Sequence, residues 1–308
     1  MKTLLVTLAF ALSPLSAATH YLTISGLGGE ADYEQRFAAQ AKEIEKLLRG
    51  SGGDVNVITL SGADATREKI KAAFERIASA AKPDDAFVLT LIGHGTYDGN
   101  DYKFNIPGPD YSGADLAGLC DRIPATRQLI VNTTSASGGA LPALQKPKRA
   151  VIAATKAGGE RNATVFARYW VEALRDAAAD GDKNEVVSAL EAYRYADRKT
   201  VEFYETNKRL STEHAMLEDT GAGEGVRAPS TANGQGLLAA SFPLLRIGSA
   251  QRAAADPAKR ALIERKEQLE QKIDKLKYEK AAMPLEDYRR QMSASLLELA
   301  RLQEELDK

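Results

Sequence analysis

The feature that most constrains the fold is an alternation of short apolar runs with helical stretches over the first two-thirds of the chain. The run AFVLTLI, residues 86–92, is almost entirely apolar, which is typical of a strand buried on both faces of a sheet. Four further runs predict strands: HYLTIS (20–25), VNVITL (55–60), RQLIVNTT (127–134) and RAVIAAT (149–155). This rhythm predicts an α/β fold with a mostly parallel sheet sandwiched by helices.

The segments between these runs have helical periodicity or turn composition. Helices are predicted over 31–48, 65–81, 113–123, 160–178 and 184–208. The segment 211–236 is rich in Gly, Ser, Thr and charged residues, so it is predicted to be a loop region.

The charge balance and the cysteine and histidine content exclude several classes of protein. A formal net charge of -1 gives no bulk reason to expect a nucleic-acid partner or an anionic membrane. The single cysteine, Cys120, excludes an intramolecular disulfide, and it shares an apolar helix face with Leu116 and Leu119, so we expect a buried thiol. The three histidines have no zinc-ligand spacing, and no phosphate-loop or dinucleotide motif is present.

The first 18 residues have the layout of a secretory signal peptide. Lys2 precedes a short apolar stretch, a proline follows, and the small residues Ser16, Ala17 and Ala18 end the segment. We expect cleavage near Ala17 or Ala18 and an exported protein, periplasmic or extracellular, without a stable membrane anchor. The expected organisation is therefore a leader (1–18), an α/β domain (19–248) and a helical extension (249–308).

The helical extension carries two heptad-like apolar stripes separated by Pro284. The first stripe contains Leu262, Leu269, Ile273 and Leu276, and the second contains Leu285, Tyr288, Met292, Leu299, Leu302 and Leu306. The pattern predicts a helical hairpin or short coiled coil whose stripes form a packing seam. Self-association or partner binding through these helices is a second interpretation.

Two predicted strands end in residues capable of acyl-transfer chemistry. Residues 86–92 run into Gly-His-Gly, with His94 at the centre, and 127–134 runs into Ser135-Ala-Ser-Gly-Gly. Ligand sites in parallel sheets lie beyond the carboxyl ends of the strands, so neighbouring strands would bring these two residues to one crevice. Histidine would then act as the base for a hydroxyl nucleophile, with glycine amides near the oxyanion.

An apolar strand ending in His-Gly, followed by a later strand ending in a nucleophile, one residue and Ser-Gly, resembles the caspase and legumain group of cysteine peptidases. Over about residues 21–247, the resemblance implies a caspase-hemoglobinase-like fold. It places His94 at the catalytic histidine and Ser135 at the catalytic cysteine, with Gly95, Ser137 and Gly138 as oxyanion donor or loop frame. The stretches LGGE, GHGTYDG, KFNIPGPD and TEHAMLEDTG look similar to bacterial members of the group.

Serine in the place of cysteine is the main departure from this pattern, because a hydroxyl is far less acidic than a thiol and needs a well-aligned base. No orienting acid is evident, although Asp98, Asp101 and Asp110 follow His94. Three interpretations stay open: an inactive peptidase fold that binds a peptide or protein partner, a serine hydrolase on the same frame, or another α/β protein with similar loops.

A twelve-residue segment, 180–191, matches the ligand spacing of an EF-hand calcium loop. The expected ligands are Asp180, Asp182, Asn184, the Val186 carbonyl, Ser188 and Glu191. The sixth position requires positive φ and favours glycine, but Glu185 occupies it. Calcium is therefore one interpretation, and a turn that caps the next helix is the other.

Overall fold

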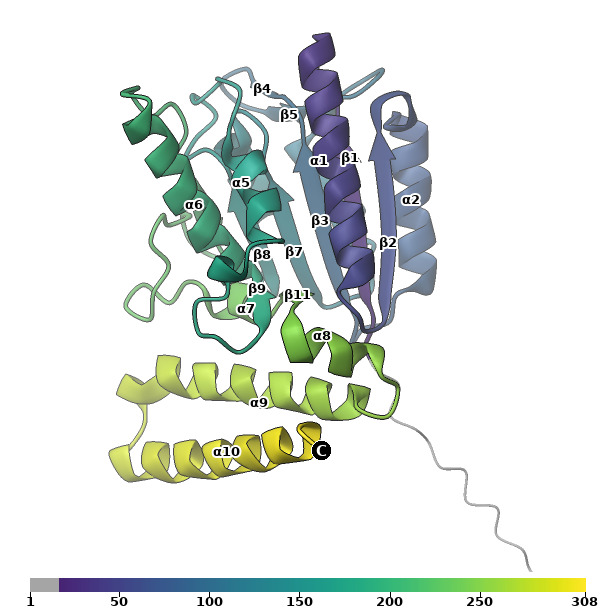
Figure 1. Ribbon diagram of the computed structural model, residues 1–308. Coiled ribbons are helices and arrows are strands. Elements are labelled where there is room, and N and C mark those ends of the chain that lie inside the picture. Colours follow the sequence, from purple (N-terminus) through teal and green to yellow (C-terminus); the bar gives the residue numbers. More distant parts are fainter. Residues whose placement is uncertain (1–16) are drawn as a thin grey trace, which may run out of the picture.

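The computed structural model describes residues 17–308, so most of the expected leader lies outside the described residues. A six-stranded sheet with the order β10-β8-β7-β3-β1-β2 forms the centre (Figure 1). Its strands are β1 (Thr19–Ser25), β2 (Val55–Ser61), β3 (Ala86–Ile92), β7 (Arg127–Asn132), β8 (Arg149–Ala153) and β10 (Met216–Glu218). Strands β1, β2, β3, β7 and β8 are mutually parallel, and β10 pairs antiparallel with β8. The predicted mostly parallel sheet is confirmed.

Each face of the sheet carries its own apolar core, because successive strand residues point to opposite faces. In β1, Tyr21 belongs to one core and Leu22 to the other. The first core is covered by α1 (Ala31–Gly50), α5 (Phe166–Ala173) and α6 (Ala189–Thr206). The second is covered by α2 (Arg67–Ala80), α3 (Gly113–Asp121) and α4 (Leu141–Leu144).

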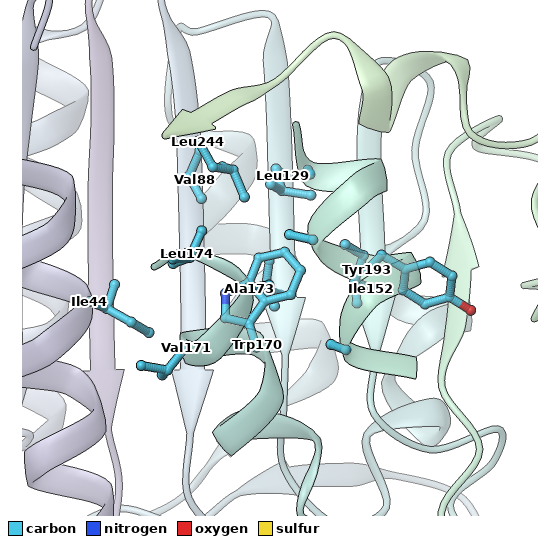
Figure 2. Packing of buried hydrophobic residues seen from close by; sticks show 14 of the residues in the cluster. Ile44, Val88, Leu129, Ile152, Trp170, Val171, Ala173, Leu174, Tyr193 and Leu244 are labelled. Carbon is cyan, nitrogen blue, oxygen red and sulfur yellow. The ribbon is translucent and has the colours of Figure 1, made fainter. Parts of the chain in front are cut away.

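Trp170 of α5 lies over the middle of the first face. It belongs to one buried cluster with Val88, Leu129 and Ile152 of three adjacent strands. Within this cluster Tyr193 of α6 lies on one side of Trp170, and Ile44 of α1 lies on the side of Val171 (Figure 2). Helices α1, α5 and α6 therefore pack as one layer on this face of the sheet, and the sheet supports the loops at both of its ends.

Two small sheets were not evident in the sequence because their strands are two to four residues long. One consists of β4 (Gly95–Tyr97), β5 (Tyr102–Phe104) and β6 (Tyr111–Ser112). The other pairs β9 (Val186–Ser188) with β11 (Pro243–Arg246). Strand β4 begins directly after His94, which fixes the backbone on that side of the candidate site.

Two predicted helix starts were wrong. The helix predicted from residue 160 begins at Phe166, because the Glu213 carboxylate accepts the amide N–H groups of Val165 and Phe166 at 2.8 and 3.1 Å. The helix predicted from residue 184 begins at Ala189, where Ser188 and Glu191 form a capping box. Likewise, the predicted loop region 211–236 contains β10.

The C-terminal extension lies beyond the amino ends of the parallel strands (Figure 1). It consists of α8 (Gly248–Ala255), α9 (Arg260–Glu279) and α10 (Leu285–Leu306), with the break at Pro284 as predicted. Within the α9 stripe Leu269, Ile273 and Leu276 are buried, as a packing seam requires, whereas Leu285, Leu296 and Leu297 of α10 are exposed. Within residues 17–308, none of the helices is sufficiently long and apolar to span a bilayer.

Candidate functional site

The carboxyl ends of β3 and β7 lie side by side, as the candidate site requires. The two strands pair directly, with Leu91 opposite Asn132. His94 follows β3 by two residues and Ser135 follows β7 by three, so the sheet brings both loops to one edge, called the carboxyl edge below.

The Ser135 hydroxyl is bound to the backbone of the residue after His94. Its Oγ accepts a hydrogen bond from the Gly95 amide N–H at 3.2 Å and donates to the Gly95 carbonyl at 3.2 Å. Ser135 is 2% exposed. The hydroxyl therefore has both a donor and an acceptor on one neighbouring residue.

The His94 imidazole lies against helix α1. Its ring centroid is 4.8 Å from that of Tyr33 and 5.2 Å from that of Phe37, both in edge-on geometry. Burial lowers the pKa of the imidazole below its ordinary value, and a hydrogen bond with the backbone of Gly28 opposes this shift. Arg36 lowers the pKa further. The result is an imidazole that is neutral at pH 7, as a general base must be.

The two groups are close in the fold but they are not coupled. Within residues 17–308 no hydrogen bond joins the His94 ring to the Ser135 hydroxyl. The Gly95 N–H, which was the expected oxyanion donor, is occupied by Ser135 Oγ. In this state the base does not activate the hydroxyl, and that donor is not free for a substrate.

The turn that carries Ser135 is held in a strained conformation. Ala136 has a φ of 57°, in the left-handed region that favours glycine, which costs about 1 kcal/mol. Its amide N–H donates to the Glu160 carbonyl at 2.7 Å. Such strain persists where the surrounding contacts determine the backbone, and here the loop after β8 supplies the contact.

Ser137 and Gly138 hold this turn against the residues that follow β8. Ser137 Oγ accepts the Thr155 amide at 3.1 Å, and the Gly138 amide donates to Thr155 Oγ1 at 2.8 Å. A Cβ at Gly138 would lie 2.4 Å from backbone atoms of Thr155, Lys156 and Ala157. The glycine is needed for this close approach, and its amide is already bound inside the frame. Gly139 likewise donates to the Ala136 carbonyl, so neither amide serves the expected oxyanion role in this state.

The other residues predicted near this site lie elsewhere or have structural roles. Asp98 Oδ1 accepts the amides of Asn100 and Asp101, and Asp110 accepts Asn105 Nδ2 and the Ile106 amide. These are turn contacts, so the aspartates do not orient His94. Cys120 is buried, as predicted, and its burial raises the pKa of the thiol to about 12.

One acid–histidine pair beside the Ser135 turn, Glu160 and His214, was not predicted from the sequence. The Glu160 carboxylate binds His214 Nδ1 at 2.5 Å and accepts the backbone amides of His214 and Lys156. Because the Glu160 carbonyl also receives Ala136, this residue joins the loop after β8 and the segment before β10 to the Ser135 turn. The 54-residue separation of Glu160 and His214 leaves no local signal in the sequence.

The predicted calcium loop is at the opposite edge of the sheet, beside α9. Carboxylate oxygens of Asp180, Asp182 and Glu191 all lie within 4.8 Å of one another. Asp180 Oδ1 accepts the Asn184 amide, and Asn184 Oδ1 accepts the Val186 amide. The first, third and twelfth positions therefore converge.

The remaining predicted ligands are part of the hydrogen-bond frame of the loop. Ser188 donates its hydroxyl to Glu191 Oε2 at 2.8 Å, while Val186 is the first residue of β9. Asp180 likewise accepts the amides of Asn184 and Glu185, and Asp182 accepts the amide and the side chain of Asn184.

Glu185, the residue that departs from the calcium pattern, has a role of its own. Its φ is 67°, the conformation for which the pattern requires glycine. Its carboxylate accepts the Ala250 amide at 2.9 Å and the Ser249 hydroxyl, at the start of α8. The side chain thus caps α8, which offsets the strain and attaches the helical extension to the loop.

A cavity of about 470 Å³ separates the loop from α9. Its charged lining consists of five acidic side chains (Asp182, Glu191, Glu267, Glu270 and Asp274) and three basic ones (Arg194, Arg198 and Lys277). Glu270 and Asp274 of α9 face the loop, and Asn184 Nδ2 donates to Glu270 at 3.4 Å. Burial and the neighbouring Glu191 raise the pKa of Asp182 to about 6, and burial raises that of Glu270 to about 7 despite Lys266. After burial, the carboxylates of Glu191, Asp180 and Asp274 raise the pKa of Asp182 further, so negative charge is concentrated around this side chain.

No family model and no curated protein matches the chain. Among solved structures, it is similar to a protein from Geobacter sulfurreducens, with 13% identity and a TM-score of 0.46, covering 76% of this chain and all of that one. It is also similar to the Drosophila initiator caspase Dronc, with 10% identity, a TM-score of 0.43 and coverage of 68% and 82%. Caspase-1 from Spodoptera frugiperda has 11% identity, a TM-score of 0.46 and coverage of 70% and 94%. These likenesses are distant, and the α/β architecture rests on the sheet described above.

Proposed function

We propose that this chain is an exported, caspase-like protein that recognises a peptide or protein partner at the carboxyl edge without hydrolysing it. The supporting observation is the state of Ser135, whose hydroxyl is closed on the Gly95 backbone rather than on an imidazole. A serine hydroxyl without a coupled base is a poor nucleophile. A rigid Ser135 turn whose hydroxyl is not coupled to His94 is suited to recognition rather than to hydrolysis.

The rim of this edge offers a contact surface for such a partner. Leu27, two residues after β1, is 37% exposed and precedes Gly28, whose backbone forms a hydrogen bond with His94. The charged residues Glu30 and Arg36 lie on the same rim at the start of α1. An apolar side chain flanked by both charges is suited to an extended peptide with mixed side chains.

Fluorophosphonate labelling separates this proposal from the serine-hydrolase alternative. A recognition protein gives no adduct at Ser135, whereas a hydrolase is labelled, and the label is lost in Ser135→Ala and in His94→Ala. Stoichiometric, His94-dependent labelling of Ser135 would make the chain a serine hydrolase and end the proposal.

Binding is tested with a displayed random-peptide library and two surface variants. We expect selected peptides to bind the parent chain and Leu297→Asp, which alters the exposed face of α10. The same peptides should lose at least about tenfold in affinity to Leu27→Asp, a loss of about 1.4 kcal/mol. Equal binding to both variants would place recognition away from the carboxyl edge.

A second function, calcium binding by residues 180–191, is favoured by the convergence of Asp180, Asp182 and Glu191. These residues have the oxygen donors and the spacing of the EF-hand loop, and Glu185 adopts the backbone conformation that the sixth position requires. When bound, the ion would neutralise the carboxylates and fix the loop on which α8 and α9 rest.

Isothermal titration with calcium chloride tests this second function, with Asp180→Ala as the control. We expect heat with 1:1 stoichiometry from the parent and none from the variant. Absence of heat from the folded parent would show that the loop is a helix-capping turn.

A further inference from the structure

Asp85 is a buried carboxylate at the amino edge of the sheet, in the turn before β3. It is 4% exposed. The Ala18 backbone nitrogen donates to Oδ1 at 2.9 Å, and the Lys82 amide donates to Oδ2 at 2.8 Å. His20 Nε2 lies 3.2 Å from Oδ2, and His20 is itself buried.

These partners do not supply a permanent positive charge. Within residues 17–308 no lysine or arginine side chain pairs with Asp85, and the only ion pair of this carboxylate involves a histidine. Burial raises the pKa of Asp85, but the Lys82 and Ala18 amides and His20 outweigh it and hold the pKa below its ordinary value. The carboxylate is thus ionised at neutral pH, and buried charges normally have a fixed counter-ion.

The nitrogen that faces Asp85 Oδ1 lies at the expected end of the leader. Ala17 is exposed, whereas the Ala18 carbonyl already accepts the Ala86 amide at 2.9 Å at the start of the sheet. The neighbouring alternative is different: the Thr19 nitrogen donates to the backbone carbonyl of Asp54, which carries no charge. Cleavage after Ala17 would therefore place the new amine beside the Asp85 carboxylate, whereas cleavage after Ala18 would not.

We propose that maturation cleaves the Ala17–Ala18 bond and that the resulting Ala18 α-ammonium is the counter-ion of Asp85. This inference rests on export, but not on the chemistry of the carboxyl edge. A signal peptidase would break the Ala17 C–Ala18 N bond with one water: the hydroxyl goes to the Ala17 carbonyl carbon and a proton to the Ala18 nitrogen. The amine, with an ordinary pKa of about 8, then takes up a proton from solvent.

Cleavage would change the charge of the Ala18 nitrogen and leave its position relative to Asp85 unchanged. In the uncut chain the Ala18 nitrogen is a neutral amide donor, 2.9 Å from Oδ1. In the cut chain the same atom makes a charge-assisted bond to the same oxygen. The mature chain is therefore stabilised relative to a chain that has any residue before Ala18.

The first test expresses the chain from Met1 and determines its cellular location, intact mass and N-terminal sequence. We expect Ala18 as the first residue. A chain that begins at Thr19 would overturn this inference and leave export standing, whereas one that retains Met1 would overturn both.

The second test is a thermodynamic cycle with two first residues and two residues at position 85. Refolded chains beginning at Ala18 or at Ala17 are compared, each with Asp85 or Asp85→Asn. We expect the extra residue to lower the Tm by about 5 °C when Asp85 is present and by less than about 1 °C in Asp85→Asn. Equal losses in both backgrounds would contradict the ion pair.

A crystal structure of the exported chain tests the contact even if Asp85→Asn does not fold. We expect the Ala18 amine within about 3 Å of Asp85 Oδ1, the distance of a charge-assisted bond. An amine directed into solvent would overturn the inference.

Discussion

The two edges of the sheet use polar groups in different ways. At the carboxyl edge, Ser135, Ser137 and Gly138 are held by neutral hydrogen bonds to backbone and hydroxyl groups. At the amino edge, charged side chains join elements far apart in the sequence, as Arg246 does with Glu267. The amino edge also holds the buried charges of Asp85 and Glu267.

The shape of the Ser135 turn and the hydrogen bond of its hydroxyl therefore depend on different contacts. Tight backbone approaches preserve the shape of the Ser135 turn without any contribution from the hydroxyl–imidazole contact. The charged contacts at the amino edge instead attach the helical extension, the acidic loop and the first strand to one another. Changes at the two edges should therefore have different consequences.

The largest expected effect is at the carboxyl edge, in Gly95→Ala. A Cβ at this position would lie 2.4 Å from the Ser135 carbonyl oxygen, 2.5 Å from the Tyr102 ring and 2.7 Å from Thr134 Oγ1. Because this site is buried and rigid, we expect a loss of more than about 3 kcal/mol in the free energy of unfolding, measured in guanidinium.

Gly118→Ala in α3 is the matched control for this substitution. No heavy atom lies within 4 Å of its added Cβ, so we expect a gain of up to about 1 kcal/mol from helix propensity. If Gly95→Ala were as well tolerated as Gly118→Ala, the backbone around Gly95 would be able to move away from Ser135 and Tyr102, and the rigid packing of this site would be contradicted.

At the amino edge, Glu267→Gln should destabilise the attachment of α9. Glu267 makes two hydrogen bonds to Arg246, at 2.6 and 2.9 Å, and both side chains are largely buried. Removing the negative charge leaves the buried guanidinium uncompensated, so we expect a loss of about 2 to 3 kcal/mol in chemical denaturation.

The exposed Arg265–Glu298 pair within the hairpin provides the comparison. Glu298→Gln should cost less than about 0.5 kcal/mol because solvent screens this pair. Equal effects of Glu267→Gln and Glu298→Gln would show that burial of charge does not distinguish the amino edge.

The smallest effect on stability is a pH dependence of the acidic loop. Because Asp182 and Glu270 have raised pKa values of about 6 and about 7, the folded state binds protons that the unfolded state releases. In a metal-free buffer the free energy of unfolding should therefore rise as the pH falls from about 7.5 to about 5. We expect these two carboxyl groups to contribute about 1 kcal/mol to this rise after screening by solvent.

Asp182→Asn isolates this contribution in thermal unfolding. We expect the variant to be more stable than the parent at pH 7.5, with an advantage that shrinks as the pH falls through about 6. A constant difference between the two chains over this range would exclude excess negative charge at the loop.

The sheet could be predicted because buried parallel strands leave continuous apolar runs, as in 86–92. The positions of His94 and Ser135 followed from the same runs. The start of α5 could not be predicted in the same way, because it depends on Glu213, a carboxylate almost fifty residues away. The start of α6 is marked by the local capping box of Ser188 and Glu191, which the helix prediction did not use.

The hydrogen bonds that decide the chemistry of the candidate site could not be predicted from the sequence either. The bond of His94 to the Gly28 backbone and that of Ser135 to Gly95 involve peptide groups, which every residue has. Tyr33 and Phe37 are four residues apart, so the sequence did place two aromatic side chains on one face of α1. This is the face against which the His94 ring lies.

The decoupling of His94 from Ser135 is tested most directly by the pKa of His94, measured by NMR titration in the parent and in Ser135→Ala. A hydrogen-bond partner contributes to the pKa of an imidazole, whereas a hydroxyl bound elsewhere does not. Arg36→Gln, which removes a charge that lowers this pKa, should raise it and confirm that the titration senses the site. We predict a His94 pKa below its ordinary value that is the same in the parent and in Ser135→Ala. A change of more than about 0.5 units on removing the Ser135 hydroxyl would show that the two groups are coupled and would contradict the account.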